Sequence, residues 1–254
     1  MSDSHPVPAE HDAELHAIAE AFELAEPVNR VTPLGNGNVN TTHLVEAGGE
    51  RYVLQRLNTS VFREPELVMA NLQQLLHHAQ GRLQTLQQQP DSPLAGRRWE
   101  LPRVINSRRV NQAWHRCPKG GFWRMISFVE DARSIDVIEN RQQARELGWG
   151  LGLFHHLISD LPVQRLADTL EGFHITPRYL KAYHQALVHS RAEPCDLSRF
   201  CLGFIRESEA GCAVLEQAKA RGELPLRPIH GDPKINNLLL ARGSGQAIAL
   251  IDLD

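Results

Sequence analysis

Three short β-like runs within residues 28–58 limit the fold of this chain more than any other feature. The runs VNRVTPL, THLVEA and RYVLQRL alternate or continue in apolar residues, and the turn sequences GNGN and AGGE separate them. Short runs of this kind, joined by tight glycine turns, are typical of neighbouring antiparallel strands. This part of the chain is therefore predicted to form an antiparallel meander.

Helical spacing precedes the meander and dominates the second half of the chain. Helices are predicted over residues 13–25, 64–80, 134–161, 176–188 and 197–222. Pro65 suits the first turn of the second helix, and Ser134 is the predicted N-cap of the third. Gly148 and Gly152, four residues apart in that third helix, are expected to allow close helix packing. Residues 80–98 are interpreted as a loop, helical only at its start.

More strands are expected between and after these helices. They are predicted over 101–106, 112–117 and 122–129, and a final hairpin joins LLLAR to QAIALIDL through GSG. This order predicts an α+β fold with an antiparallel-sheet N-terminal lobe over residues 13–130 and a mainly helical C-terminal lobe over 131–254. Residues 1–12 are rich in Pro, Ser and acids and are expected to be disordered.

Composition excludes several classes of partner. A formal net charge of −3 without a long basic cluster argues against nucleic acid. The N-terminus lacks the pattern of a signal or transit peptide, and the apolar runs are far shorter than the roughly 20 residues that cross a bilayer, so no membrane is expected and the chain is predicted to be cytoplasmic. No C-x-x-C pair occurs, which favours reduced structural thiols at Cys117, Cys195, Cys201 and Cys212.

The segment PIHGDPKINNLLLARGSGQAIALIDLD carries most of the chemistry in the sequence. Counting outward from the GSG turn places Asn237 opposite or nearly opposite Asp252, where side chains lie about 4.5 to 5.5 Å apart. Their oxygens could then reach one Mg²⁺ at about 2.0 to 2.1 Å. Asp232, on the loop entering the hairpin, could take the proton of an acceptor hydroxyl, with His230 and Gly231 supporting the loop. This is the division of labour of a kinase.

These residues also resemble a known family. HGDPKINN followed by IDLD is similar to the H-x-D-x-x-x-x-N and Asp-strand motifs of the aminoglycoside phosphotransferase and choline kinase group. The resemblance implies a protein-kinase-like two-lobed fold that binds ATP and Mg²⁺. It also implies Asp232 as the catalytic base, Asn237 and Asp252 as metal ligands, and Asp254 as a further candidate ligand.

A narrower resemblance concerns the acceptor. YVLQRLN, VFREPELVMANL, GGFWRM and EGFHITPR are similar to segments of the N-acetylhexosamine 1-kinase branch, and together the matches span residues 31–254. They imply transfer of the γ-phosphate to a small molecule, a sugar such as an N-acetylhexosamine, at its anomeric hydroxyl. Choline, homoserine or an aminoglycoside are the alternative substrates.

A phosphate-covering turn is implied between the first two strands. Its candidate nucleotide contacts are Gly35, Asn36, Gly37 and Asn40. Two glycines in a hairpin turn are also compatible with a turn that has no further role.

The remaining nucleotide contacts follow from the same resemblance. The strand that usually carries a phosphate-binding Lys has Gln55 at the aligned position, so either Arg56 or the metal would have to supply the missing charge. Glu66 is the counterpart of the kinase helix Glu, or only an acid that favours a helix N-terminus. Phe128 to Glu130 would form the hinge that contacts adenine.

The chain ends directly after the metal-binding strand, where this family continues with helices of the acceptor pocket. The predicted C-terminal lobe is therefore incomplete, and two other functions stay open. One is a nucleotide-binding module, or inactive fragment, without turnover. The other is a metal-dependent phosphohydrolase, which would not explain the N-terminal strand lobe.

Overall fold

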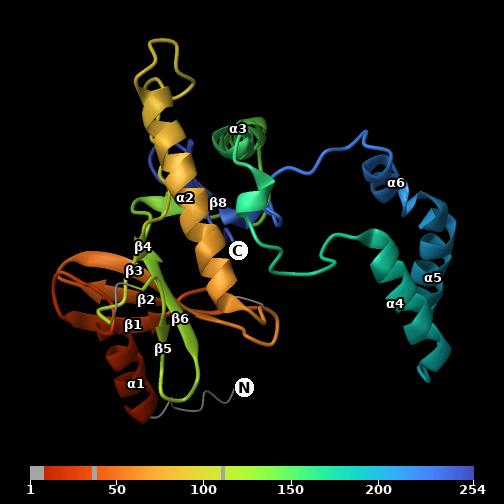
Figure 1. Cartoon of the computed structure of the whole chain (residues 1–254), viewed down its shortest axis with the longest axis horizontal. Helices are drawn as coiled ribbons and strands as arrows, with labels where there is room; N and C mark the ends of the chain where they lie inside the picture. Colours follow the sequence, from red (N-terminus) through yellow and green to blue (C-terminus); the bar gives the residue numbers. More distant parts are fainter. Residues whose placement is uncertain (1–8, 36–38, 110–111) are drawn as a thin grey trace. The chain divides into compact units, whose positions relative to one another are not determined.

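The computed structural model describes residues 9–35, 39–109 and 112–254. They form an α+β fold with an antiparallel sheet, as the sequence predicts (Figure 1). The chain divides into two compact units. The first unit runs up to Thr169 and resumes over Pro228–Asp254, and the second unit is Leu170–Arg227. This division differs from the lobe boundary predicted at residues 130 and 131, which stays a prediction.

The meander of the first unit forms as predicted. Strands β1 (Val28–Pro33), β2 (Thr41–Ala47) and β3 (Glu50–Leu57) pair antiparallel in sequence order. Strand β6 (Phe122–Ser127) joins β3, and the short strands β4 (Val104–Ile105) and β5 (His115–Arg116) both pair with β6. Burial alternates along β2 and β3, which gives the sheet one core-facing surface.

Helix α1 (Ala9–Glu20) covers this surface beside β1 (Figure 1). Leu15, Ile18 and Phe22 are buried against Leu54 and Met125 of the sheet. The helix begins at Ala9, within the segment for which disorder is expected, and that expectation stays a prediction. The helix ends before the predicted residue 25, because Phe22 leaves the helix to form a β-bridge with Ser107.

Helix α2 (Pro65–Gln87) starts at the predicted proline but continues into the segment interpreted as a loop. Its apolar residues stay in register through Leu83 and Leu86, both buried, so packing extends the helix past its polar Gln-rich surface.

Helix α3 (Arg141–Ile158) begins later than predicted. The N-cap is Asn140, whose side-chain oxygen accepts a hydrogen bond from Gln143 N at 2.9 Å, and not Ser134. The residues before it are held elsewhere, because strand β7 (Ala132–Arg133) pairs with β8 (Leu238–Ala241), which in turn pairs with β9 (Ala247–Leu250).

The hairpin β8–β9 packs on α3 through a glycine that the sequence did not single out. A Cβ at Gly150 would lie 2.6 Å from Leu238 Cδ1 and 3.1 Å from Ala247 Cβ. A Cβ at Gly148 or Gly152 would meet no described atom within 4 Å. The predicted role of Gly148 and Gly152 in close packing is therefore wrong, because both face away from the hairpin.

The second unit is helical. It contains α4 (Thr176–His189), α5 (Asp196–Ser208) and α6 (Val214–Ala220). The single helix predicted over 197–222 is interrupted by a 3₁₀ turn over Glu209–Gly211. Among the described residues, no helix combines the length and the apolar character that crossing a membrane requires.

Candidate active site

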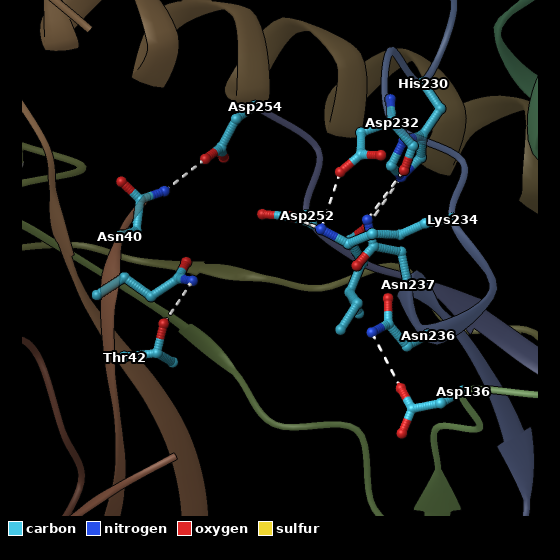
Figure 2. Close-up of polar contacts among 12 residues, drawn as sticks. Asn40, Thr42, Asp136, His230, Asp232, Lys234, Asn236, Asn237, Asp252 and Asp254 are labelled. Atoms are coloured by element: carbon cyan, nitrogen blue, oxygen red, sulfur yellow. Dashed lines mark hydrogen bonds and ion pairs between the residues drawn. The ribbon is translucent and has the colours of Figure 1, made fainter. Parts of the chain in front are cut away.

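A cavity of about 730 Å³ lies in the first unit. Its walls come mainly from the β1–β2 turn, β2, β3, β6 and the residues around the β8–β9 hairpin. The predicted site residues that line it are Gly35, Asn40, Gln55, Phe128, Asp232, Asn237 and Asp252. Figure 2 shows Asp232, Asn237 and Asp252 gathered around Lys234. The structure therefore brings the three residues of the predicted catalytic group together.

His230 fixes the loop that carries Asp232. Its Nδ1 accepts a hydrogen bond from Asp232 N at 3.2 Å, and its Nε2 lies 2.9 Å from the carbonyl oxygen of Ile251. A backbone N–H only donates and a carbonyl only accepts, so both bonds form with the proton on Nε2. The buried imidazole thus ties the loop to the residue next to Asp252, the support predicted for it.

Lys234 links the two acids and is a site residue that the sequence analysis did not name. Its Nζ lies 2.9 Å from Asp232 Oδ2 and 3.9 Å from Asp252 Oδ2. The hydrogen bond to Asp232, together with the charges of both carboxylates, raises the pKa of Lys234 above its usual value. The ammonium therefore stays charged between two acids. Its place within HGDPK was the signal that could have found it.

Asn237 is positioned to offer its side-chain oxygen. It ends a short 3₁₀ helix (Ile235–Asn237) before β8, and its Nδ2 donates to the carbonyl oxygen of Asp232 at 2.9 Å. That bond sets the amide orientation, leaving Oδ1 available as a ligand atom. The carbonyl of Asn237 accepts from Ile251 N at 2.8 Å, so Asn237 lies across from Ile251 and only nearly opposite Asp252.

The backbone conformation and the burial of Asp252 both cost folding free energy. Its φ is 65°, in the left-handed region that Asp tolerates better than most residues. Burial, followed by the nearby charge of Asp254, raises the pKa of its carboxyl above the usual range. A carboxylate held in this way is stabilised by a cation.

The donors present fit Mg²⁺. The described residues hold no cluster of three or more His, Cys, Asp or Glu side chains suited to a metal ion. Mg²⁺ does not need one, because it is bound by one or two carboxylates together with substrate phosphates and water. Asp252 and the Oδ1 of Asn237 are the residues that would hold it.

Both carboxylate oxygens of Asp254, a further candidate metal ligand, contact protein groups. Its Oδ2 accepts a hydrogen bond from Asn40 Nδ2 at 2.9 Å (Figure 2), and its Oδ1 forms an ion pair with Arg124. Asn40 Oδ1 in turn accepts from Asn58 N at 3.0 Å. Asp254 thus joins the chain after β9 to the β1–β2 turn and to β6.

Other predicted residues do not line the cavity. Glu66 forms an ion pair with Arg116 of β5, and the Glu130 side chain forms one with Arg51 of β3. In each case a cation from a neighbouring strand draws the carboxylate to the surface. Asn36 and Gly37 lie outside the described residues.

The side of the cavity that β2, β3 and β6 line contains a chain of side-chain hydrogen bonds. Gln55 Nε2 donates to Thr42 Oγ1 at 3.2 Å (Figure 2 shows Thr42), and Gln55 Oε1 accepts from Arg124 Nε at 2.9 Å. Arg56 is exposed and does not line the cavity. Arg124 was not among the predicted site residues, although a charge within the apolar run FWRMISFV is a signal that sets a residue apart from an ordinary core position.

An acid on a His-supported loop and an amide–carboxylate pair line one cavity of this α+β fold, an arrangement that suits a kinase-type phosphotransferase. The chain belongs to the phosphotransferase enzyme family, whose sequence profile matches residues 30–254. The predicted enzyme class and the predicted phosphotransferase family are confirmed, whereas the N-acetylhexosamine 1-kinase branch stays a prediction.

Solved structures share the fold at low sequence identity. An aminoglycoside phosphotransferase from Alicyclobacillus acidocaldarius is 17% identical with a TM-score of 0.54, and the match covers 99% of this chain and 67% of that one. The spectinomycin phosphotransferase APH(9)-Ia, solved with ADP and spectinomycin, is 13% identical with a TM-score of 0.57, and the match covers 98% of this chain and 70% of that one. The chain thus spans about two thirds of the length of these proteins.

Proposed function

We propose that this protein transfers the γ-phosphoryl group of ATP, in the presence of Mg²⁺, to a hydroxyl group of a small molecule. The observation that carries the proposal is the convergence of Asp232, Asn237 and Asp252 on one cavity, which the β1–β2 turn also lines. Phosphoryl transfer depends mainly on positioning and charge neutralisation, and these residues supply both.

The cavity has a separate region for each part of the nucleotide. Phe128 and Val129 line it beyond the end of β6, where they offer apolar surface and backbone groups to the adenine. Gly35 and Asn40 line it at the β1–β2 turn, close to where the phosphates would lie. Gly35 has a φ of 67°, a conformation that glycine adopts without strain and that the turn requires.

The chain's own groups then perform the transfer. Asp232 Oδ accepts the proton of the acceptor hydroxyl as that oxygen forms a bond to the γ-phosphorus. The bond from the γ-phosphorus to the bridging oxygen breaks, and the electron pair leaves with ADP. Lys234, held beside Asp232, adds positive charge where negative charge accumulates. Asp252 and Asn237 would hold Mg²⁺, which would supply neutralisation of charge on the phosphate oxygens.

The acceptor that we propose is an N-acetylhexosamine phosphorylated at its anomeric hydroxyl. The support is the resemblance of YVLQRLN, VFREPELVMANL, GGFWRM and EGFHITPR to the hexosamine 1-kinase branch. An aminoglycoside is the second candidate, because two solved proteins with this fold are named for aminoglycoside or spectinomycin phosphorylation. Both acceptor classes present a hydroxyl on a ring that also carries nitrogen substituents.

The test is a transfer assay with ATP and Mg²⁺ over a panel of GlcNAc, GalNAc, glucose, choline, homoserine and spectinomycin. ADP release and the mass of the product identify the acceptor. Asp232→Asn is expected to lower kcat by at least about 100-fold, because general base catalysis contributes that much, while ATP affinity changes by less than about threefold.

Asp91→Asn, a change at an exposed acid in the loop after α2, is the matched control and should leave kcat unchanged. ATP binding without product from any acceptor would instead identify a nucleotide-binding module. Unchanged turnover in Asp232→Asn would exclude Asp232 as the base.

A further inference from the structure

The strand position that usually supplies a cation to the nucleotide phosphates is occupied here by Gln55. Within the described lining of the cavity, the cationic side chains are Arg124, Arg133, Lys234 and Arg242. Arg133, Lys234 and Arg242 are exposed, and Lys234 is already paired with Asp232. Arg124 is 2% exposed and is therefore the buried cation of this lining.

Arg124 is the direct neighbour of Gln55. The two residues are paired across β3 and β6, and Arg124 Nε donates to Gln55 Oε1 at 2.9 Å. A Lys at position 55 would face the guanidinium across the sheet at this distance, and like charges in that arrangement repel. In this chain the neutral amide is at position 55, where a lysine is usual, and the cation is on the neighbouring strand at position 124.

The guanidinium still has a free donor group. Its Nη2 pairs with Asp254 and its Nε with Gln55, but Nη1 is buried without a hydrogen-bond partner among the described residues. Leaving a buried charged donor unpaired costs free energy, because the group has lost its hydrogen bonds to water. Arg124 lines the cavity, and an oxyanion that reached Nη1 from there would satisfy it, because guanidinium and phosphate form strong charge-assisted hydrogen bonds.

We propose that Arg124 binds the phosphates of the nucleotide and replaces the strand lysine that this chain lacks. The proposal rests on the proposed function, since it assigns a residue to the same ATP site. Asp254 holds the guanidinium in place, and Asn40 links this pair to the β1–β2 turn. The Arg124 side chain is therefore held by Asp254 on the segment after β9 and by Gln55 on β3.

Nucleotide binding tests this assignment without requiring turnover. The affinities of the full chain for ATP and ADP with Mg²⁺, and for adenosine, are measured by calorimetry. Arg124→Met is expected to weaken ATP and ADP binding by about 10- to 100-fold, the effect of losing a hydrogen bond to a charged group. Adenosine affinity should change by less than about twofold, because adenosine has no phosphate.

Arg56→Met is the matched control, because Arg56 neighbours Gln55 on β3 but is exposed and outside the cavity. Its ATP affinity should equal that of the unaltered chain. The double variant Gln55→Lys/Arg124→Met returns the charge to β3 and should recover at least about fivefold of the lost ATP affinity. It also decides the question if Arg124→Met alone does not fold, since it keeps one cation within the Gln55–Arg124 strand pair.

Three results would overturn the assignment. They are unchanged ATP affinity in folded Arg124→Met, an equal loss of ATP and adenosine binding, and a double variant that folds but recovers nothing. If the unaltered chain binds neither ATP nor ADP, the proposed function fails and this inference fails with it. Binding by the unaltered chain and by Arg124→Met with equal affinity rejects the role of Arg124 alone.

Discussion

Asp252 illustrates at the scale of one residue how a binding site is kept ready at the expense of stability. Its backbone lies in the left-handed region, and burial together with Asp254 raises the pKa of its carboxyl. Each feature opposes folding with an ionised Asp at this position, and strained or desolvated residues of this kind cluster at functional sites. A cation bound between Asp252 and Asn237 would offset both effects.

Removal of this carboxylate provides the first prediction. Asp252→Ala should reduce the affinity for ATP in the presence of Mg²⁺ by at least about tenfold, because the metal loses a charged ligand. Without Mg²⁺ its ATP affinity should not fall, because the removed carboxylate repels the phosphates when no metal lies between them. Calorimetry with and without EDTA measures both effects.

The exposed Asp91 again supplies the control, and Asp91→Ala should keep the full Mg²⁺ dependence. If Asp252→Ala shows the same gain in ATP affinity from Mg²⁺ as the unaltered chain, Asp252 is not a metal ligand.

The site residues that sequence could locate are those joined by local chain geometry. Asn237 and Asp252 are related by one hairpin, and Asp232 precedes it by a few residues, so spacing alone brings them together. Glu66 and Glu130 are different, because Arg116 and Arg51 draw them away and lie far from them in the sequence. The residues next to Glu66 and Glu130 in the sequence do not indicate these ion-pair partners.

At the scale of elements, the contact of α3 with the β8–β9 hairpin sets the position of the two proposed metal ligands, Asn237 and Asp252. Asn237 directly precedes β8 and Asp252 follows β9 by two residues. The close approach at Gly150 lets Leu238 and Ala247 rest against the helix backbone. The packing of the hairpin against α3 therefore helps to determine where Asn237 and Asp252 lie.

Two glycine substitutions in the same helix should have opposite effects. Gly150→Ala places a methyl group 2.6 Å from Leu238 Cδ1, and such overpacking costs about 1–3 kcal/mol of unfolding free energy. Gly152→Ala meets nothing within 4 Å and should stabilise the protein by about 0.5–1 kcal/mol, because alanine favours the helix. Urea unfolding measures both changes.

The two variants should also differ in nucleotide binding. Gly150→Ala should also weaken the Mg²⁺-dependent binding of ATP, because the displaced hairpin carries Asn237 and Asp252, whereas Gly152→Ala should leave it unchanged. Equal stability in the two variants would show that the hairpin does not rest on Gly150.

Helices and strands could be predicted from the sequence where the apolar pattern is local. Which face of α3 packs against the β8–β9 hairpin could not. The strands of the meander and the final hairpin follow from alternation and turn residues. The glycines of α3 were visible, but which of them meets the hairpin depends on the direction from which β8 and β9 approach. Likewise, the start of α3 at Asn140 follows from the pairing of Ala132 and Arg133 with β8, a contact between distant segments.

At the scale of the whole molecule, the described lining of the cavity belongs to one unit although it comes from both ends of the sequence. It runs from Leu34 to Leu253, and the second unit, Leu170–Arg227, interrupts the chain between these ends without supplying a lining residue. The sequence order suggests two consecutive lobes, but compactness depends on the return of residues 228–254 to the first unit. That return rests on long-range packing, which a linear pattern does not contain.

This organisation leads to a prediction for hydrogen exchange. A ligand stabilises only those openings that destroy its site, by about 2.7 kcal/mol at a concentration 100 times Kd, which corresponds to roughly 100-fold slower exchange. ATP with Mg²⁺ should therefore slow exchange of amides in β1–β3 and in residues 228–254. Amides of α4, α5 and α6 should exchange at unchanged rates, because none of their residues is among the described residues that line the cavity. Asp252→Ala, measured under the same conditions, should lose most of the protection in residues 228–254. Equal slowing across α4–α6 would mean that the two units open together, and the nucleotide site would then depend on the whole chain.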